Sequence, residues 1–194
     1  MQRTTWRFLS GKSIIRKLWL LVESFGFLRI AQLQIHTQQG KKARSARFPQ
    51  IQQSPDLFAG IEKRALRLGD YSIAGMEELC VVERKDLSDL VHSCTTDRTM
   101  FISRMRRMAS YPHRLLVISS PLSQIKSPYP YADVNPNRIT QSLVAILAGL
   151  HVPFLYTETH ELGEELVASF LYQMHLYHWL ETNGYGRFLV DGDL

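Results

Sequence analysis

The sequence predicts an α/β domain with a central mixed sheet flanked by helices. Three observations support this prediction. Short, strand-like apolar runs alternate along the chain with longer runs of helical periodicity. The 194 residues, 45% of them hydrophobic, suffice for one domain with a sizeable core. The only two cysteines, Cys80 and Cys94, exclude a disulfide scaffold and favour a reducing, cytoplasmic compartment.

Periodicity and end signals give the expected elements. Strands are expected at residues 30–36, 64–68, 71–74, 79–84, 114–119 and 152–156. Helices are expected at residues 86–94, 97–110, 136–150 and 159–182. Asp86 can cap the first helix, Pro136 suits the first turn of the third, and Asn183-Gly184 closes the last. We expect Gly69-Asp70 to sit in a hairpin, and the proline-rich residues 120–137 to form a surface loop.

Charge divides the chain into two parts. Residues 1–50 hold ten Lys or Arg and one acid, whereas the remainder holds thirteen basic and seventeen acidic residues. A basic arm on a mildly acidic body indicates an anionic partner, either nucleic acid or a membrane surface. No run reaches the ~18 uncharged apolar residues of a membrane span, so no membrane is expected. We expect a basic, amphipathic N-terminal extension at residues 1–29 and the functional domain, with its long C-terminal helix, at 30–194.

The candidate residues for chemistry lie in two places. One is Gly69-Asp70, and the other is the end of the strand expected at 79–84. Side chains alternate along a strand, so Glu83 and Lys85 share a face while Val82 and Arg84 point the other way. A carboxylate that can hold a divalent metal, beside a lysine that can stabilise developing phosphate charge, suits phosphodiester hydrolysis. Asp70 is the candidate second acid. The alternative is a solvated charge cluster, with Asp89 as a first-turn acid of the next helix.

Gly69-Asp70 followed by Glu83-Arg84-Lys85-x-x-x-Asp89 resembles the G-D-x(n)-E-R-K-x(3)-D signature of the XPF family of structure-specific endonucleases. The resemblance covers roughly residues 64–156 and is closest to compact bacterial or phage-type members. It implies a restriction-endonuclease-like fold and metal-dependent cleavage of branched or junction DNA, in repair or recombination. Residues 30–194 would then form the nuclease domain.

The resemblance also assigns roles to individual residues. Asp70 and Glu83 would bind Mg²⁺ or Mn²⁺, Lys85 would assist the attacking water, and Arg84 and Asp89 would organise the site. Arg98 would contact the DNA backbone. Arg104 and Arg107, which share a helix face, are further candidates for phosphate contact or for a solvated basic face.

The sequence departs from the family pattern in two places. His36, Gln38 and Gln39 replace the acidic and basic residues that usually end the first core strand, and Ser119 stands where relatives often have glutamate. Both changes remove negative charge from the expected site and put a two-metal arrangement in doubt. His36 is either a metal ligand or a hydrogen-bonded structural residue.

The leading hypothesis is therefore a Mg²⁺- or Mn²⁺-dependent DNA endonuclease. It would act in the cytoplasm, associated with the nucleoid if bacterial. The rival is a catalytically silent DNA-binding scaffold subunit of a nuclease complex. A third, weaker hypothesis is a membrane-surface protein anchored by residues 10–30. The final helix is apolar on more than one side, which would allow a homodimer.

Overall fold

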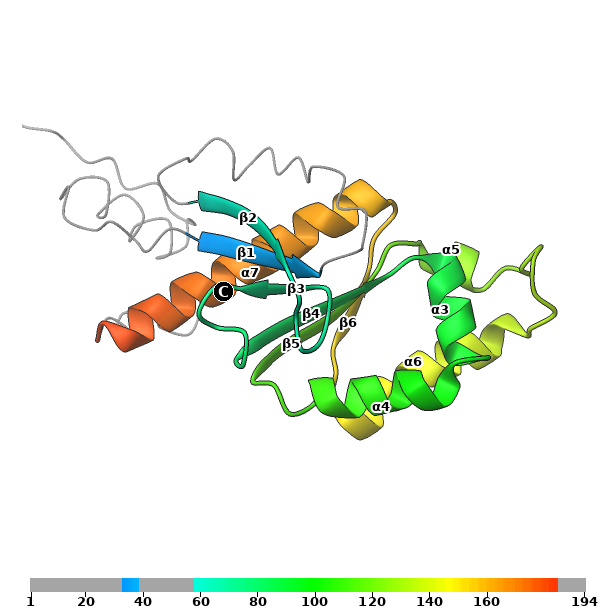
Figure 1. Cartoon of the computed structure of the whole chain (residues 1–194). Helices are drawn as coiled ribbons and strands as arrows, with labels where there is room; N and C mark the ends of the chain where they lie inside the picture. The colour runs from blue at the N-terminus through cyan, green and yellow to red at the C-terminus, as the bar shows by residue number, and fades with distance from the viewer. Residues whose placement is uncertain (1–32, 39–57, 185–194) are drawn as a thin grey trace, which may run out of the picture. The chain divides into compact units, whose positions relative to one another are not determined.

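The fold is described by a computed structural model that covers residues 33–38 and 58–184 (Figure 1). The chain divides into two compact units, residues 32–175 and residues 1–31 with 176–194. The first unit contains all residues of the E-R-K motif. The expected N-terminal extension, residues 1–29, lies outside the described residues, as does all of the basic arm, residues 1–50, except 33–38.

Strands and helices alternate through the described part of the chain, as expected. The elements are β1 (Leu33–Gln38), β2 (Phe58–Arg64), β3 (Tyr71–Ile73), β4 (Cys80–Lys85), α3 (Leu87–Cys94), α4 (Arg98–Met108), β5 (His113–Ile118), α5 (Leu122–Ile125), α6 (Pro136–Leu150), β6 (Phe154–Tyr156) and α7 (His160–Thr182). Asp86 caps α3 through a hydrogen bond from the Asp89 amide, and Asn135 caps α6 with Pro136 in its first turn. No helix among these residues is both long and apolar enough to cross a membrane.

The strands form one mixed sheet of six, in the order β2-β1-β3-β4-β5-β6. β3 runs antiparallel to both of its neighbours, β1 and β4, whereas β4, β5 and β6 are parallel. Helices α3 and α4 connect β4 to β5, and α5 and α6 connect β5 to β6. The carboxyl ends of these three strands therefore meet at one edge of the sheet, where Lys85 pairs with Ile118 and Ile118 with Tyr156. The predicted α/β fold with a mixed sheet is confirmed.

Helices cover the two faces of this sheet (Figure 1), and an apolar core lies against each face. Val81, Leu116 and Ile118 pack on one face against helices α3, α4 and α6. Val82, Leu115 and Val117 pack on the other face against Val167, Ala168 and Leu171 of α7. β4 and β5 are buried on both faces, which explains why they read as continuous apolar runs.

Two expected elements are wrong. The expected strand at 64–68 is irregular beyond Arg64, because β3 has β1 as its second neighbour and forms no hairpin with that segment. The preceding strand, β2, is one that the sequence pattern does not predict. Residues 120–137 are not wholly a surface loop, since they contain α5 and bury Ile125 and Tyr129, whose hydroxyl donates to the Ile125 carbonyl.

Close packing of α7 at the edge of the sheet depends on Gly163. A Cβ at this position would lie 2.6 Å from Ser119 Oγ and 3.1 Å from Thr157 Oγ1. We expect Gly163→Ala to lower the free energy of unfolding by about 1–2 kcal/mol, despite the better helix propensity of alanine. The measurement is urea denaturation.

Gly149→Ala is the matched control for this substitution. It is also helical, but a Cβ there meets nothing within 4 Å, so it should be neutral or slightly stabilising. Adding Ser119→Ala to Gly163→Ala should recover stability, because it removes the nearer of the two atoms. A double variant no more stable than Gly163→Ala alone would show that Ser119 is not the obstacle.

Candidate active site

The site begins with Asp70, which is held against β4 by two hydrogen bonds. Its backbone amide donates to the Val82 carbonyl over 2.8 Å, and its carboxylate Oδ2 accepts from the Arg84 amide over 2.9 Å. These two bonds bracket Glu83, the residue between Val82 and Arg84. Asp70 is 5% exposed. The turn before β3 therefore fixes the first candidate ligand beside the second.

Glu83 lies at the centre of a small network of charges. It is 1% exposed, and its Oε1 forms an ion pair with Lys85 Nζ at 3.1 Å and accepts a hydrogen bond from Arg104 Nη1 at 2.8 Å. Lys85 is 8% exposed and comes from the same strand, as the predicted alternation requires. Arg104 reaches Glu83 from α4. A buried carboxylate needs such partners, because its charge is otherwise costly to remove from water.

The negative charges of Glu83 and Asp70 both influence the pKa of Arg104. The charge of Glu83 raises the pKa of Arg104 above its ordinary value, against the opposing effect of burial, and the hydrogen bond to Glu83 and the charge of Asp70 add to the rise. Asp70 and Glu83 thus form a joint negative site, and Arg104 and Lys85 neutralise it. The sequence indicates Arg104 as a DNA contact and gives no sign of this ion pair, which spans 21 residues.

Arg84 points to the other face of the sheet, where it contacts three side chains of the part of the chain that the structure describes. Its Nε donates to the Tyr71 hydroxyl at 3.3 Å, and its Nη1 donates to Ser119 Oγ at 3.4 Å and to His160 Nδ1 at 2.7 Å. Because Arg84 can only donate, His160 carries its proton on Nε2 and donates it to Glu164 Oε1, 3.1 Å away. Burial raises the pKa of Tyr71, partly offset by Arg84. Arg84 therefore joins β4 to α7, and sequence reasoning missed His160 because it lies 76 residues away.

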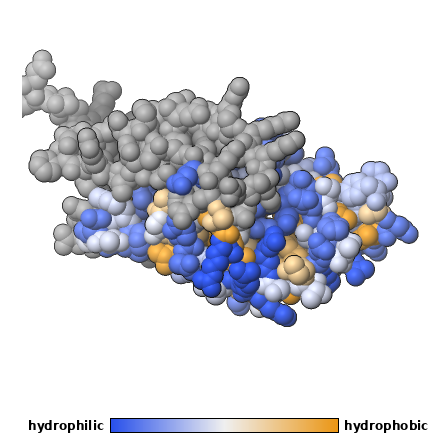
Figure 2. Space-filling model, in the orientation of Figure 1, coloured by the Kyte–Doolittle hydropathy of each residue, from blue (hydrophilic) through white to orange (hydrophobic). Residues whose placement is uncertain are grey.

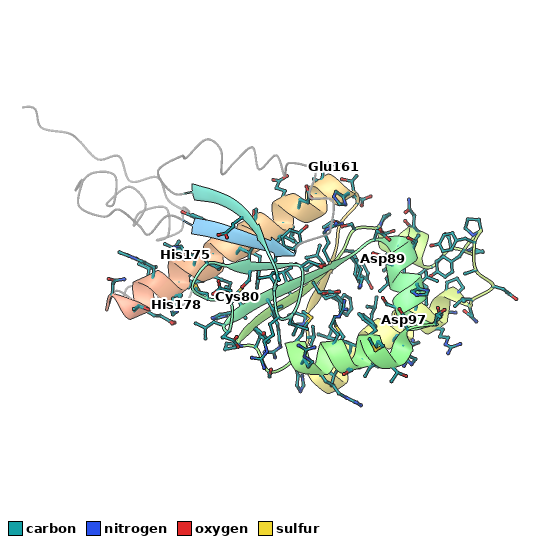
Figure 3. The ribbon with its side chains drawn as sticks, viewed as in Figure 1. Cys80, Asp89, Asp97, Glu161, His175 and His178 are labelled. Atoms are coloured by element: carbon teal, nitrogen blue, oxygen red, sulfur yellow. The ribbon has the colours of Figure 1, made fainter. Side chains whose placement is uncertain are left out.

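The other candidates from the sequence lie around this centre. Asp89 is exposed in the first turn of α3 (Figure 3), where its amide donates to Asp86. Arg98 Nη1 donates to Ser142 Oγ of α6 at 2.7 Å, and Arg107 Nη2 donates to the Arg67 carbonyl at 3.1 Å. The visible surface over α4 is mainly hydrophilic in Figure 2. Of the three candidate arginines on α4, Arg104 is the one that forms an ion pair with Glu83 within the described residues.

The family departures have different structural settings. His36 and Gln38 lie on β1, whose His36 pairs with Ser72 and whose Thr37 pairs with Tyr71, so the strand runs toward Asp70. Gln39 lies outside the described residues. Ser119 contacts Arg84 on the face opposite Glu83, and its hydroxyl also lies against Gly163 of α7. Where relatives often have glutamate, Ser119 therefore leaves an uncharged hydroxyl beside Arg84, on the face opposite Glu83.

The donor set suits a hard divalent cation. Mg²⁺ binds through one or two carboxylates and keeps several waters, and the buried carboxylates of Asp70 and Glu83 provide that number. Within the described ranges, no group of three or more His, Cys, Asp and Glu gathers into a metal site. The two carboxylates that could hold one ion are those of Asp70 and Glu83, beside each other at β4.

The comparisons with known proteins agree with this arrangement. The model of the ERCC4 domain matches residues 50–170. The chain belongs to the ERCC4 domain family. This match contains Asp70, Glu83, Lys85 and Arg104, so the ERCC4 domain holds the whole network of charges described above. No curated protein is similar enough to count as a match.

Solved structures share the fold of this ERCC4 domain. XPF from Aeropyrum pernix matches with a TM-score of 0.54 and 19% identity, over 78% of this chain and 69% of that one. A structure of XPF from Aeropyrum pernix in complex with DNA matches with a TM-score of 0.53 and 18% identity, over 76% of this chain and 66% of that one. The ERCC4 domain here is an XPF-type nuclease domain with a restriction-endonuclease-like fold, as the motif predicted.

Proposed function

We propose that this protein is a DNA endonuclease that depends on Mg²⁺ or Mn²⁺. The observation that carries the proposal is the convergence of two buried carboxylates, Asp70 and Glu83, with Lys85 at the end of β4. Membership of the ERCC4 family and the likeness to a structure of XPF with DNA support it.

Each side chain has a role in the proposed reaction. Asp70 and Glu83 would hold the divalent ion, which supplies Lewis-acid stabilisation of charge on the phosphate. Lys85 would orient the attacking water and stabilise the negative charge that develops on the scissile phosphate, for which its ammonium is already fixed by Glu83. Arg84, which is hydrogen-bonded to His160 on the other face, would hold β4 in place against α7. Asp89 would help to organise the site from the first turn of α3, outside the group of Asp70, Glu83 and Lys85.

The DNA would lie along α4, next to the charged centre. Arg98, Arg104 and Arg107 come from this helix, and cationic side chains supply most of the affinity of a protein for DNA phosphates. We propose branched or junction DNA as the substrate, in repair or recombination, with the protein in the cytoplasm and able to form a homodimer.

A catalytically silent DNA-binding subunit is the second candidate. Two observations favour it: Arg104 and Lys85 already satisfy Glu83, and the contacts of Arg84 with Tyr71 and His160 are structural. Such a subunit would bind branched DNA in a salt-sensitive manner and would cut nothing.

Cleavage of labelled DNA separates the two candidates. Flap, fork and plain duplex substrates are incubated with the full chain in Mg²⁺, Mn²⁺ or EDTA, beside Asp70→Asn as the variant with a weakened ion site. We expect cutting in either metal, none in EDTA, and at least a hundredfold slower cutting by Asp70→Asn. Retained binding without cutting in any condition would identify the silent subunit instead.

A further inference from the structure

We propose that Arg104 competes with the divalent ion for Glu83, and so sets the ion concentration at which the site loads. This inference rests on the proposed function, because it takes Asp70 and Glu83 as the ion's ligands. It assigns to Arg104 a role that the motif does not contain, since Arg104 lies outside Gly69-Asp70 and Glu83-Arg84-Lys85-x-x-x-Asp89.

Two cations already lie beside the Glu83 carboxylate, where the divalent ion would bind. Lys85 Nζ and Arg104 Nη1 both contact Glu83 Oε1, at 3.1 and 2.8 Å. Glu83 is almost wholly buried, so an ion bound to either oxygen of this carboxylate lies close to both cations with little water to screen them. Binding of an ion to Glu83 therefore works against the two existing contacts.

Arg104 is the partner able to leave. Lys85 is fixed on β4, and its side chain is 10% exposed, whereas the side chain of Arg104, on α4, is 45% exposed. Its long stem and planar guanidinium can turn to solvent or to a DNA phosphate, which it can bind through two parallel hydrogen bonds. Lys85 can keep its catalytic position during this exchange.

The charges give the direction of the effect. Asp70 and Glu83 carry two negative charges, and Lys85 and Arg104 carry two positive ones. A divalent ion added beside these groups would be repelled by both cations, and the departure of Arg104 removes its part of that repulsion. Removing the guanidinium should therefore tighten ion binding.

Binding of Mn²⁺ to the full chain without DNA tests this proposal. Free Mn²⁺ is measured by electron paramagnetic resonance during titration of wild type, Arg104→Ala and Arg106→Ala. Arg106 is the matched control, because it is exposed on the same helix and its loss removes the same charge. We expect Arg104→Ala to bind Mn²⁺ about tenfold more tightly, and Arg106→Ala to remain within about twofold of wild type.

Thermal unfolding supplies a second readout. In EDTA, Arg104→Ala should melt below wild type, because Glu83 then has one cationic partner fewer. Added Mn²⁺ should raise the melting temperature of the variant more than that of wild type. Should Arg104→Ala fail to fold, Arg104→Met keeps most of the stem and carries the same expectations.

Glu83→Gln distinguishes a failure of the proposed competition from a failure of the proposed metal site. Equal or weaker Mn²⁺ binding by Arg104→Ala, while Glu83→Gln does weaken binding, overturns the competition and leaves the ion site in place. Mn²⁺ binding that Glu83→Gln does not weaken shows that the ion does not bind at Glu83. That result overturns the competition together with the metal site of the proposed function.

Discussion

Glu83→Gln should reduce DNA cleavage at least about a thousandfold, while the affinity for DNA stays the same or rises. The amide keeps the size of the side chain but removes the negative charge that both the divalent ion and Lys85 require. A thousandfold loss corresponds to about 4 kcal/mol of transition-state stabilisation. The affinity for DNA should not fall, because the substitution removes a buried negative charge close to the arginines proposed to contact phosphates and adds none. The measurements are single-turnover cleavage of a flap substrate and fluorescence anisotropy.

The control for this change is Glu78→Gln. It is chemically the same substitution at an exposed carboxylate, whose ion pair with Arg67 lies in solvent and contributes little. Circular dichroism spectra of both variants show whether the fold is retained. Glu83→Gln that is folded and retains more than a tenth of wild-type cleavage would remove Glu83 from the catalytic machinery.

Gly69→Ala should lower the free energy of unfolding by about 3 kcal/mol. Gly69 has a positive φ of 76°, a conformation that side chains rarely adopt. In addition, a Cβ there would lie 2.4 Å from Val81 Cγ2 and 2.9 Å from the Val82 carbonyl oxygen, atoms of the strand that also carries Glu83. Strain and collision therefore act together. We expect the melting temperature to fall by about 6–12 °C.

Gly75→Ala separates these two causes. Its φ is 79°, close to that of Gly69, but a Cβ there meets nothing within 4 Å. It should cost about 1 kcal/mol, from strain alone. The excess loss in Gly69→Ala measures the collision with β4. Any shift of the following residue, Asp70, should appear as weaker Mn²⁺ binding in Gly69→Ala and not in Gly75→Ala. Equal losses in the two variants would contradict a role for the contact with β4.

Local signals predicted most of the elements and half of the site. Asp86 and Pro136 mark helix starts through their own backbone chemistry, so α3 and α6 could be placed within one or two residues. Alternation along β4 likewise placed Glu83 and Lys85 on one face. Both kinds of signal depend on neighbours in the chain.

Contacts between distant segments could not be predicted in this way. The pairing of β3 with β1 replaced the expected hairpin, because strand neighbours are chosen by the packing of the whole sheet. Arg104 meets Glu83 only because α4 packs on the same sheet face as Glu83, and His160 meets Arg84 only because α7 packs on the opposite face. A basic helix face and a lone histidine give no indication of such partners.

The face of the sheet on which the Arg84 side chain lies affects how this arginine should be interpreted in related sequences. Its guanidinium bonds to Tyr71, Ser119 and His160, on the side of the sheet away from Asp70 and Glu83. The middle letter of the E-R-K motif therefore has an architectural role, whereas the proposed chemistry belongs to the outer two. A relative that had lost the ability to cut DNA would still need this arginine to join its sheet to its last helix. Glu83 and Lys85, rather than the complete motif, are the residues by which an active member should be told from an inactive one.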